Sequence, residues 1–350
     1  MVTIKEVAKA CGVSVATVSN VLNGKGRVGE KTKKKVLDTA KEIGYVPNLL
    51  AKNLKQHGTR TIGVITEDLT VFNCVDIVDG INECLDAWGY TFILGNLRLY
   101  KKFKNAFYHN EEYYREVERE FQVMQSRRVE GFIYIGAHSR KIKSIPADLH
   151  VPIVMAYGYA GEKRIPSVTY DDEQGGFDAT SHLIARGHKR IGIIQGESES
   201  IHTARRMLGY QKALYQNGIL YNPDHVMPGD WSRESGYEAC EKLYKQGVRA
   251  IFSMNDVMAA GVYDFAHGNY LQVGKDIALV GFDDREIAKA FNPELATMAL
   301  PLSEIGRKAA EMVLYRIEKG ISLEDTPELI SLKCTFVERP SIGGAPEKDG

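Results

Sequence analysis

Residues 3–24 read TIKEVAKACGVSVATVSNVLNG and predict two short helices joined by a tight turn. Thr3 and Glu6 have the spacing of a capping box, in which a hydroxyl and a carboxylate can each satisfy a backbone N–H. Gly12 can end the first helix in the left-handed conformation, and Ser14 is a good N-cap for the second. Apolar residues recur at helical spacing, namely Ile4, Val7, Ala8, Cys11, Val18, Val21 and Leu22. Because helices this short are unstable alone, the pattern requires a third helix.

The third helix is predicted over residues 30–43, with Gly44 as its stop. Its apolar stripe is expected to comprise Val36, Leu37, Ala40 and Ile43. A helix–turn–helix completed by a third helix is typical of proteins that bind DNA with the second helix in the major groove. A generic three-helix bundle is the alternative that this pattern leaves open.

The distribution of charge favours DNA binding. Residues 1–60 hold 12 Lys and Arg against 4 Asp and Glu, a net charge of +8, and the remainder holds 33 against 41, a net charge of −8. A basic head on an acidic body suits a polyanion at one end only. The basic residues that flank the second and third helices, and that are expected to contact phosphates without reading sequence, are Lys25, Arg27, Lys31, Lys33, Lys34 and Lys35.

The ordered match over residues 3–23 resembles the headpiece of the lactose/purine repressor (LacI/GalR) family of bacterial transcription regulators, and the similarity continues to about Pro340. The resemblance implies a helix–turn–helix headpiece over residues 1–46, a hinge helix or linker over 47–58 and an effector-binding core over 61–340. It divides the core into an N-subdomain (about 61–170 and 301–330) and a C-subdomain (about 171–300 and 331–340). The tail, 341–350, has no leucine heptads, so we expect no tetramer-forming coiled coil there.

The resemblance also implies which residues contact DNA. They are Thr3, Ser14, Val15, Ala16, Thr17, Ser19, Asn20, Asn23, Leu54 and Lys55. Val15 and Ala16 suit contact with thymine methyl groups, and Asn20 pairs best with adenine. Leu54 matches the leucine that the family inserts into the minor groove. The hinge is too short for a stable isolated helix, so we expect DNA to order it, which slower amide exchange of residues 48–56 on DNA would reveal.

From Thr61 onward the sequence alternates between strand and helix patterns. Buried strands are expected at 61–65, 90–94, 132–135, 153–156, 190–194, 250–253 and 277–281, and helices at 77–88, 175–186, 204–217, 235–246 and 256–267. Such alternation predicts two doubly wound parallel sheets. Ligands of open parallel sheets bind beyond the carboxyl ends of the strands. Together with the resemblance, this alternation predicts an all-α headpiece followed by an α/β core of the periplasmic-binding-protein type, with the ligand between two subdomains.

The candidate effector site combines residues near strand ends. Residues 229–236, GDWSRESG, are close to a family segment at the cleft, where the Trp231 indole can stack on a pyranose. The positions that the resemblance assigns to effector contact are Phe72, Asn73, Asp171, Arg206, Trp231, Asn255 and Asp283. Phe72 and Asn73 stand where the family pattern is broken. The other tryptophan, Trp88, is expected in the core.

One segment is longer than its family counterpart. Between Asn96 and Arg127 the chain has about a dozen extra residues, and the insertion at 97–113 is rich in Tyr and Phe. It is either a lid or extra wall of the pocket, or a surface hairpin packed on its own aromatic side chains.

Composition limits the remaining function classes. The sequence has no apolar run long enough to span a bilayer and no secretory segment, so a cytoplasmic protein is expected. Of the five scattered cysteines, most are expected to be buried reduced thiols. No metal-ligand cluster, phosphate loop or catalytic constellation stands out, so we expect no cofactor and no enzyme activity.

The sequence predicts a homodimeric repressor of carbohydrate-utilisation genes that binds a near-palindromic operator and a sugar-like effector. Control by a nucleobase or a partner protein is the alternative.

Overall fold

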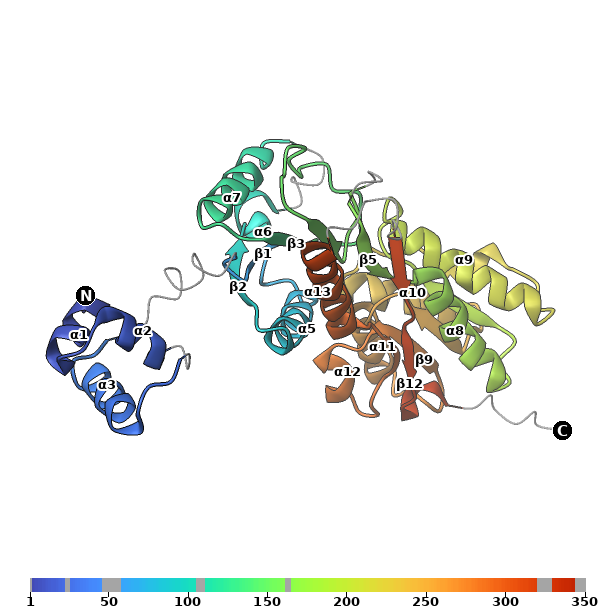
Figure 1. Ribbon diagram of the computed structural model, residues 1–350. Helices are drawn as coiled ribbons and strands as arrows, with labels where there is room; N and C mark the ends of the chain where they lie inside the picture. Colours follow the sequence, from blue (N-terminus) through green and yellow to red (C-terminus); the bar gives the residue numbers. More distant parts are fainter. Residues whose placement is uncertain are drawn as a thin grey trace. The chain divides into compact units, whose positions relative to one another are not determined.

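The computed structural model describes residues 2–22, 26–45, 58–104, 111–160, 165–319 and 329–343. It divides into two compact units, residues 1–60 and residues 61–350. Figure 1 shows the first as a small helical body and the second as a larger α/β body. Asn23, Leu54 and Lys55 lie outside the described residues, as does the hinge except for Gly58. No helix among the described residues combines the length and apolar composition needed to cross a membrane.

The first unit contains the three predicted helices: α1 (Ile4–Cys11), α2 (Val15–Leu22) and α3 (Glu30–Glu42). The Glu6 carboxylate accepts hydrogen bonds from the Thr3 backbone N–H and hydroxyl, at 2.6 and 2.9 Å. Gly12 ends α1 with φ +65°, as predicted. Fully buried residues from all three helices, Val7, Val18 and Val36, form the centre of the small core.

The predicted apolar stripe of α3 is wrong at one position. Leu37 is 45% exposed, whereas Val36 and Ala40 are buried. Residues four apart in a helix lie on the same face, and the next residue along the chain is rotated by about 100°. The core is thus contacted by positions 36, 40 and 43, which places Leu37 on the flank.

The second unit contains two six-stranded sheets. In the first sheet all strands are parallel and their order is β11-β5-β4-β3-β1-β2. Its strands are β1 (Thr61–Thr66), β2 (Thr91–Asn96), β3 (Gly131–Ile135), β4 (Ile153–Ala156), β5 (Ser167–Tyr170) and β11 (Leu329–Leu332). Its helices are α5 (Cys74–Ala87), α6 (Leu99–Phe103), α7 (Tyr114–Ser126) and α13 (Leu302–Lys319).

The second sheet has the order β12-β10-β9-β8-β6-β7, and only β12 is antiparallel to its neighbour. Its strands are β6 (Ile191–Ile194), β7 (Val226–Met227), β8 (Ala250–Ser253), β9 (Ala278–Asp283), β10 (Ala296–Ala299) and β12 (Thr335–Val337). Its helices are α8 (Asp172–Ala185), α9 (Ile201–Gln216), α10 (Arg233–Lys245), α11 (Asp256–Gly268) and α12 (Glu286–Ala290). Two open sheets with covering helices are the architecture that the sequence predicts (Figure 1).

The chain passes between the sheets three times. It leaves the first sheet after Tyr170 and returns after Ala299, near the expected positions 171 and 300. The last passage falls between Leu332 and Thr335, slightly later than the expected position 330, because all of β11 pairs with β5.

The seven predicted strands lie within two residues of observed strands, but the prediction lacks β5, β7, β10, β11 and β12. Helices α8, α9 and α10 begin two to three residues before the predicted 175, 204 and 235. Their first turns are largely polar, as in Asp172-Glu173 and His202-Thr203, so apolar periodicity does not reveal them.

Two further expectations concern burial. All five cysteines are free and buried, whereas the sequence predicted this for most of them. The expectation that Trp88 belongs to the core is wrong, because it caps the C-terminus of α5 with 44% of its surface exposed.

Helix pairs in the second unit approach at glycines. A Cβ on Gly80 of α5 would lie 2.0 Å from the Ser303 carbonyl oxygen of α13, and a Cβ on Gly306 would lie 2.0 Å from that of Ile77. The pair α8/α9 repeats this reciprocal arrangement at Gly176 and Gly209, and α10/α11 repeats it at Gly236 and Gly261. Such distances leave no room for a methyl group between the two backbones.

Gly306→Ala is expected to lower the free energy of unfolding by about 2–3 kcal/mol, because α5 and α13 must separate to admit the methyl group. Urea denaturation gives the measurement. Gly268→Ala is the matched control, since the Cβ would meet nothing within 4 Å at this helical position. Equal effects of the two substitutions would show that the close approach of α5 and α13 is unimportant for stability.

Candidate functional site

Helix α2 presents the outer face that the sequence predicts. The Ser14 hydroxyl accepts a hydrogen bond from the Thr17 N–H at 3.0 Å and so caps the helix. Val18 and Val21 are buried in the small core, which directs Val15, Ala16 and Asn20 outward as exposed residues. Of the remaining candidate DNA contacts, Thr3 and Ser14 are exposed and Thr17 and Ser19 are half-buried.

The basic residues beside this face are accessible. Those that the structure describes, all exposed, are Arg27, Lys31, Lys33, Lys34 and Lys35. Only Lys33 forms an ion pair within this described set, with Glu30 at 3.6 Å. The unit therefore combines a helix with small side chains on its outer face and cations that can reach a phosphate backbone.

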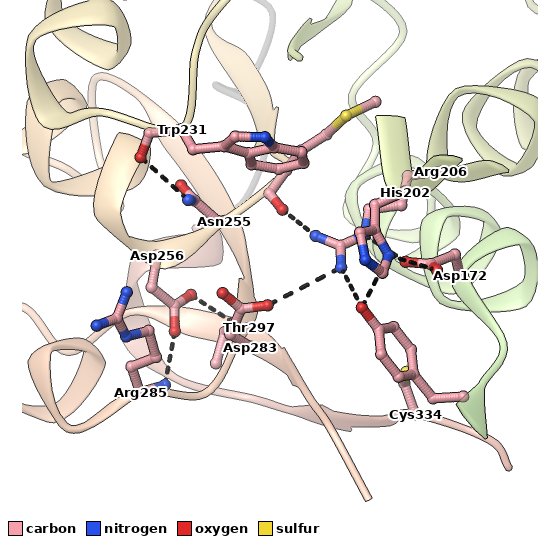
Figure 2. Close-up of polar contacts among 12 residues, drawn as sticks. Asp172, His202, Arg206, Trp231, Asn255, Asp256, Asp283, Arg285, Thr297 and Cys334 are labelled. Atoms are coloured by element: carbon pink, nitrogen blue, oxygen red, sulfur yellow. Dashed lines mark hydrogen bonds and ion pairs between the residues drawn. The ribbon is translucent and has the colours of Figure 1, made fainter. Parts of the chain in front are cut away.

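In the second unit, four candidate effector residues lie together. The Arg206 Nη2 atom is 3.9 Å from the Asp283 Oδ1 atom, and the guanidinium carbon is 5.9 Å from the centre of the Trp231 ring. The Asn255 side chain donates a hydrogen bond to the Trp231 carbonyl oxygen at 3.2 Å. In Figure 2 the Trp231 indole lies above both the Arg206 guanidinium and the Asp283 carboxylate. Residues from four separate segments thus converge as the sequence predicts.

Arg206 is held by residues that sequence reasoning missed. Its Nε atom donates to Asp172 Oδ1 at 2.7 Å, its Nη2 to the Tyr170 hydroxyl at 3.0 Å, and its Nη1 to the Met254 carbonyl oxygen. The guanidinium carbon also lies 3.6 Å from the centre of the Phe282 ring. The arginine is 3% exposed, and such a buried cation needs these compensating contacts.

His202 joins the same network one helical turn before Arg206. Its Nδ1 atom lies 2.8 Å from Asp172 Oδ2 and 3.0 Å from the Tyr170 hydroxyl. Its ring stacks on that of Tyr170 at 5.7 Å. The Nε2 atom is buried and has no hydrogen-bond partner in the described part of the chain. The four-residue spacing from Arg206 was the sequence signal available, since both then lie on one face of α9.

Burial and charge shift pKa values in this network. Burial alone would raise the pKa of Asp172, but His202 and Arg206 lower it to about 2. Burial raises the pKa of Asp283, an effect that Arg206 only partly opposes. Burial, and then the charge of Asp283, raises the pKa of Asp256, whose carboxylate accepts from the Thr297 hydroxyl and the Arg285 N–H. Acidic groups in one site thus differ strongly in proton affinity.

The wall contributed by the first sheet is less polar. The Arg285 guanidinium lies 4.8 Å from the centre of the Phe72 ring, so Phe72 meets the opposite subdomain. Asn73 is fully buried and donates to the Gly136 carbonyl oxygen at 3.2 Å, while its Oδ1 has no partner among the described residues.

Asp171 stands apart from the other candidates. It caps α8 by accepting a hydrogen bond from the Gln174 N–H at 2.9 Å. It also lines a cavity of about 360 Å³ between β5 and β11 of one subdomain and the first turns of α8 and α9 of the other. None of the other six candidate effector residues lines this cavity.

The described part of the aromatic insertion packs on the first sheet. Leu99 and Tyr113 are buried in the core cluster beneath α7. Tyr100 extends further, because its hydroxyl lies in hydrogen-bond contact with the His138 Nε2 atom beyond the end of β3. The described part of the insertion thus shares the core of the first sheet and places the Tyr100 side chain against His138.

In the described ranges, no group of three or more His, Cys, Asp or Glu residues is arranged to hold a metal ion. The residues around Arg206 offer instead hydrogen-bond donors, carboxylates and an indole face, which suit recognition of a small polar molecule.

Comparisons with known proteins agree with both units. Residues 3–48 match the family model of bacterial regulatory proteins of the lacI family, and residues 180–342 match that of the periplasmic binding protein-like domain. The chain is 33% identical to catabolite control protein A of Priestia megaterium, over 91% of this chain and 93% of that protein. It is 31% identical to the HTH-type transcriptional repressor PurR of Escherichia coli, over 100% of this chain and 99% of PurR.

Two solved structures are also similar. The lac repressor dimer bound to operator and the anti-inducer ONPF has a TM-score of 0.76 and 26% identity, over 98% of this chain and 99% of that one. The complex of the transcriptional regulator CelR with cellobiose has a TM-score of 0.64 and 27% identity, over 97% of this chain and 100% of that one.

Asp256→Asn is expected to raise the free energy of unfolding at pH 8 by about 2 kcal/mol, the equivalent of one to two pKa units. In the wild type the raised folded-state pKa means that stability falls as pH rises from about 4 through the folded pKa. An amide cannot ionise, yet it can still accept from the Arg285 N–H and donate to Thr297. Urea denaturation from pH 4 to 8 should show that the gain disappears near pH 4, whereas a constant difference would implicate packing.

Proposed function

Because the chain belongs to the lacI family of bacterial regulatory proteins, we propose that it is a repressor of carbohydrate-utilisation genes controlled by a sugar-like effector. Its place of action is the cytoplasm, where it meets chromosomal DNA. The observation that carries the proposal is the convergence of Arg206, Trp231, Asn255 and Asp283 in a chain whose first unit exposes a helix–turn–helix face.

DNA recognition rests on helix α2. Its exposed Val15 and Ala16 meet thymine methyl groups in the major groove, and Asn20 reads adenine. Two copies of the chain, paired through their cores, bind half-sites about one helical turn apart. The hinge orders on DNA and inserts Leu54 into the minor groove. This assignment is supported by the match of residues 3–48 to the family model.

Effector recognition rests on the cleft between the sheets. The Trp231 indole stacks on the C–H face of a sugar ring, and the side chains of Asp283, Asn255 and Arg206 bind its hydroxyl groups. Phe72 and Asn73 complete the site on the side of the first sheet, whereas Asp171 lines the neighbouring cavity. The similar CelR structure contains cellobiose, which supports a carbohydrate. An indole face also stacks on purines, so a nucleobase effector is the second candidate.

The effector acts by changing the relative position of the subdomains. Tyr170 belongs to the first sheet, and it hydrogen-bonds to Arg206 and His202 of the second subdomain. A ligand that binds there interacts differently with each arrangement of the subdomains and so shifts the balance between them. A few kcal/mol of differential affinity is sufficient to move DNA from bound to released.

Asn20→Ala is expected to relax base preference at one operator position, because it removes an adenine contact, whereas Lys34→Ala should weaken binding to all sequences. Selection from a randomised duplex library identifies the operator, and titrations at several salt concentrations measure affinity. Lys275→Ala, which removes an exposed lysine from the core unit, is the charge-matched control. Wild-type base preference in Asn20→Ala would contradict the assignment of α2.

Trp88→Phe leaves Trp231 as the single tryptophan, so its emission should change when a sugar fills the cleft. Trp231→Phe, which retains only Trp88, should show no change on the same titration. Trp231→Ala should weaken binding about tenfold, since a lost aromatic contact is worth about 1–1.5 kcal/mol. Titration of mono- and disaccharides beside purine bases separates the two candidate effectors. Equal affinity in Trp231→Ala would exclude the proposed stacking.

A further inference from the structure

The cavity beside Asp171 is lined by residues other than the four candidate effector residues around Arg206. Its volume of about 360 Å³ is at the small end of the range for ligand sites. One face of α9, with Ile201, Arg205 and Lys212, forms part of its wall, and the ends of β5 and β11 form another. Since Arg206, Trp231, Asn255 and Asp283 do not line it, the proposed effector contacts leave this cavity without a role.

The charges that line this cavity nearly cancel. Asp172 is paired with Arg206, and Glu173 lies 3.6 Å from Lys212. Two charged side chains of the lining, one basic and one acidic, have no ion-pair partner among the described residues. The exposed Arg205 forms no ion pair or hydrogen bond within the described ranges, and the second carboxylate oxygen of Asp171 is likewise uncommitted there. A ligand with a net charge would gain from one of these groups and be repelled by the other.

The rest of the lining consists largely of hydroxyl groups. Ser139 and Thr169 lie 3.0 Å apart as a buried pair, and Tyr159 and Ser331 add two more hydroxyls. Hydroxyls donate and accept hydrogen bonds, as do those of a sugar or polyol. A hydroxylated ligand can also donate to the Asp171 carboxylate while accepting from the Arg205 guanidinium.

We propose that this cavity is a second ligand site, which binds a neutral polyhydroxylated molecule of monosaccharide size between Asp171 and Arg205. This second site rests on the proposed function, because it requires that the core unit binds small molecules. Its ligand, however, binds outside the group of residues around Arg206.

The two sites share a wall, through which binding at one affects the other. Tyr170 and Asp172 line the cavity, and the same two side chains hold Arg206 at 3.0 and 2.7 Å. A ligand that displaces either side chain therefore changes the position or charge balance of Arg206. Such coupling is reciprocal, so an occupant of the cleft alters affinity in the cavity by the same factor.

Calorimetry on the full chain tests the second site. The probes are D-glucose, D-ribose, glycerol, cellobiose and inorganic phosphate, each titrated into wild type, Arg205→Gln, Trp231→Ala and Arg119→Gln. Arg119 is the matched control, because it is exposed on α7 and forms no ion pair or hydrogen bond within the described ranges. At least one hydroxylated probe should lose tenfold or more in affinity in Arg205→Gln and stay within twofold of wild type in Trp231→Ala and Arg119→Gln.

Other results overturn the second site in distinguishable ways. If every probe that binds is weakened by Trp231→Ala and unaffected by Arg205→Gln, the second site is wrong and the cleft proposal stands. If inorganic phosphate is the probe that depends on Arg205, the neutral ligand class is wrong. If no hydroxylated probe binds to wild type, both the second site and the sugar effector are contradicted.

Discussion

The close approach of α8 and α9 is the constraint on which the core site depends. Glycines at positions 176 and 209 let the two backbones come within a distance that a methyl group would prevent. This approach brings Asp172, in the first turn of α8, against His202 and Arg206 in the first two turns of α9. Burying three ionisable groups is costly unless they satisfy one another, and here the helix crossing supplies that geometry.

The Arg206 guanidinium already has hydrogen-bond partners within the protein. An arginine assigned to ligand contact already donates to a carboxylate, a phenol and a backbone carbonyl. It therefore acts first as a link between subdomains, because Tyr170 comes from one sheet and Arg206 from a helix of the other. Ligand binding at this point competes with internal contacts, and such competition ties occupancy to the arrangement of the subdomains.

The two units differ in net charge and in the groups that they bury. The headpiece has a small core around Val7, Val18 and Val36 and an excess of positive charge, so its surface suits contact with a polyanion. The core unit buries acids of opposite protonation tendency, with the pKa of Asp172 lowered and that of Asp256 raised. In this lacI-family chain the excess of positive charge belongs to the first unit, whereas these buried acids belong to the second.

The sequence by itself determined the three headpiece helices and the strand–helix alternation of the core, because helix caps and apolar periodicity are local properties. The resemblance to the lactose/purine repressor family, rather than periodicity, singled out Arg206, Trp231, Asn255 and Asp283, which lie together in the structure. The sequence did not determine the exposure of Leu37 or Trp88, since burial depends on which neighbours a face meets. Nor did it reveal the network of Tyr170, Asp172 and His202, because the hydrogen-bonded partners lie about 30 residues apart in the sequence. Only the tertiary structure decided that pairing, since the packing of α8 on α9 brings Asp172 to His202, and the end of β5 places the Tyr170 hydroxyl within hydrogen-bond distance of His202 and Arg206.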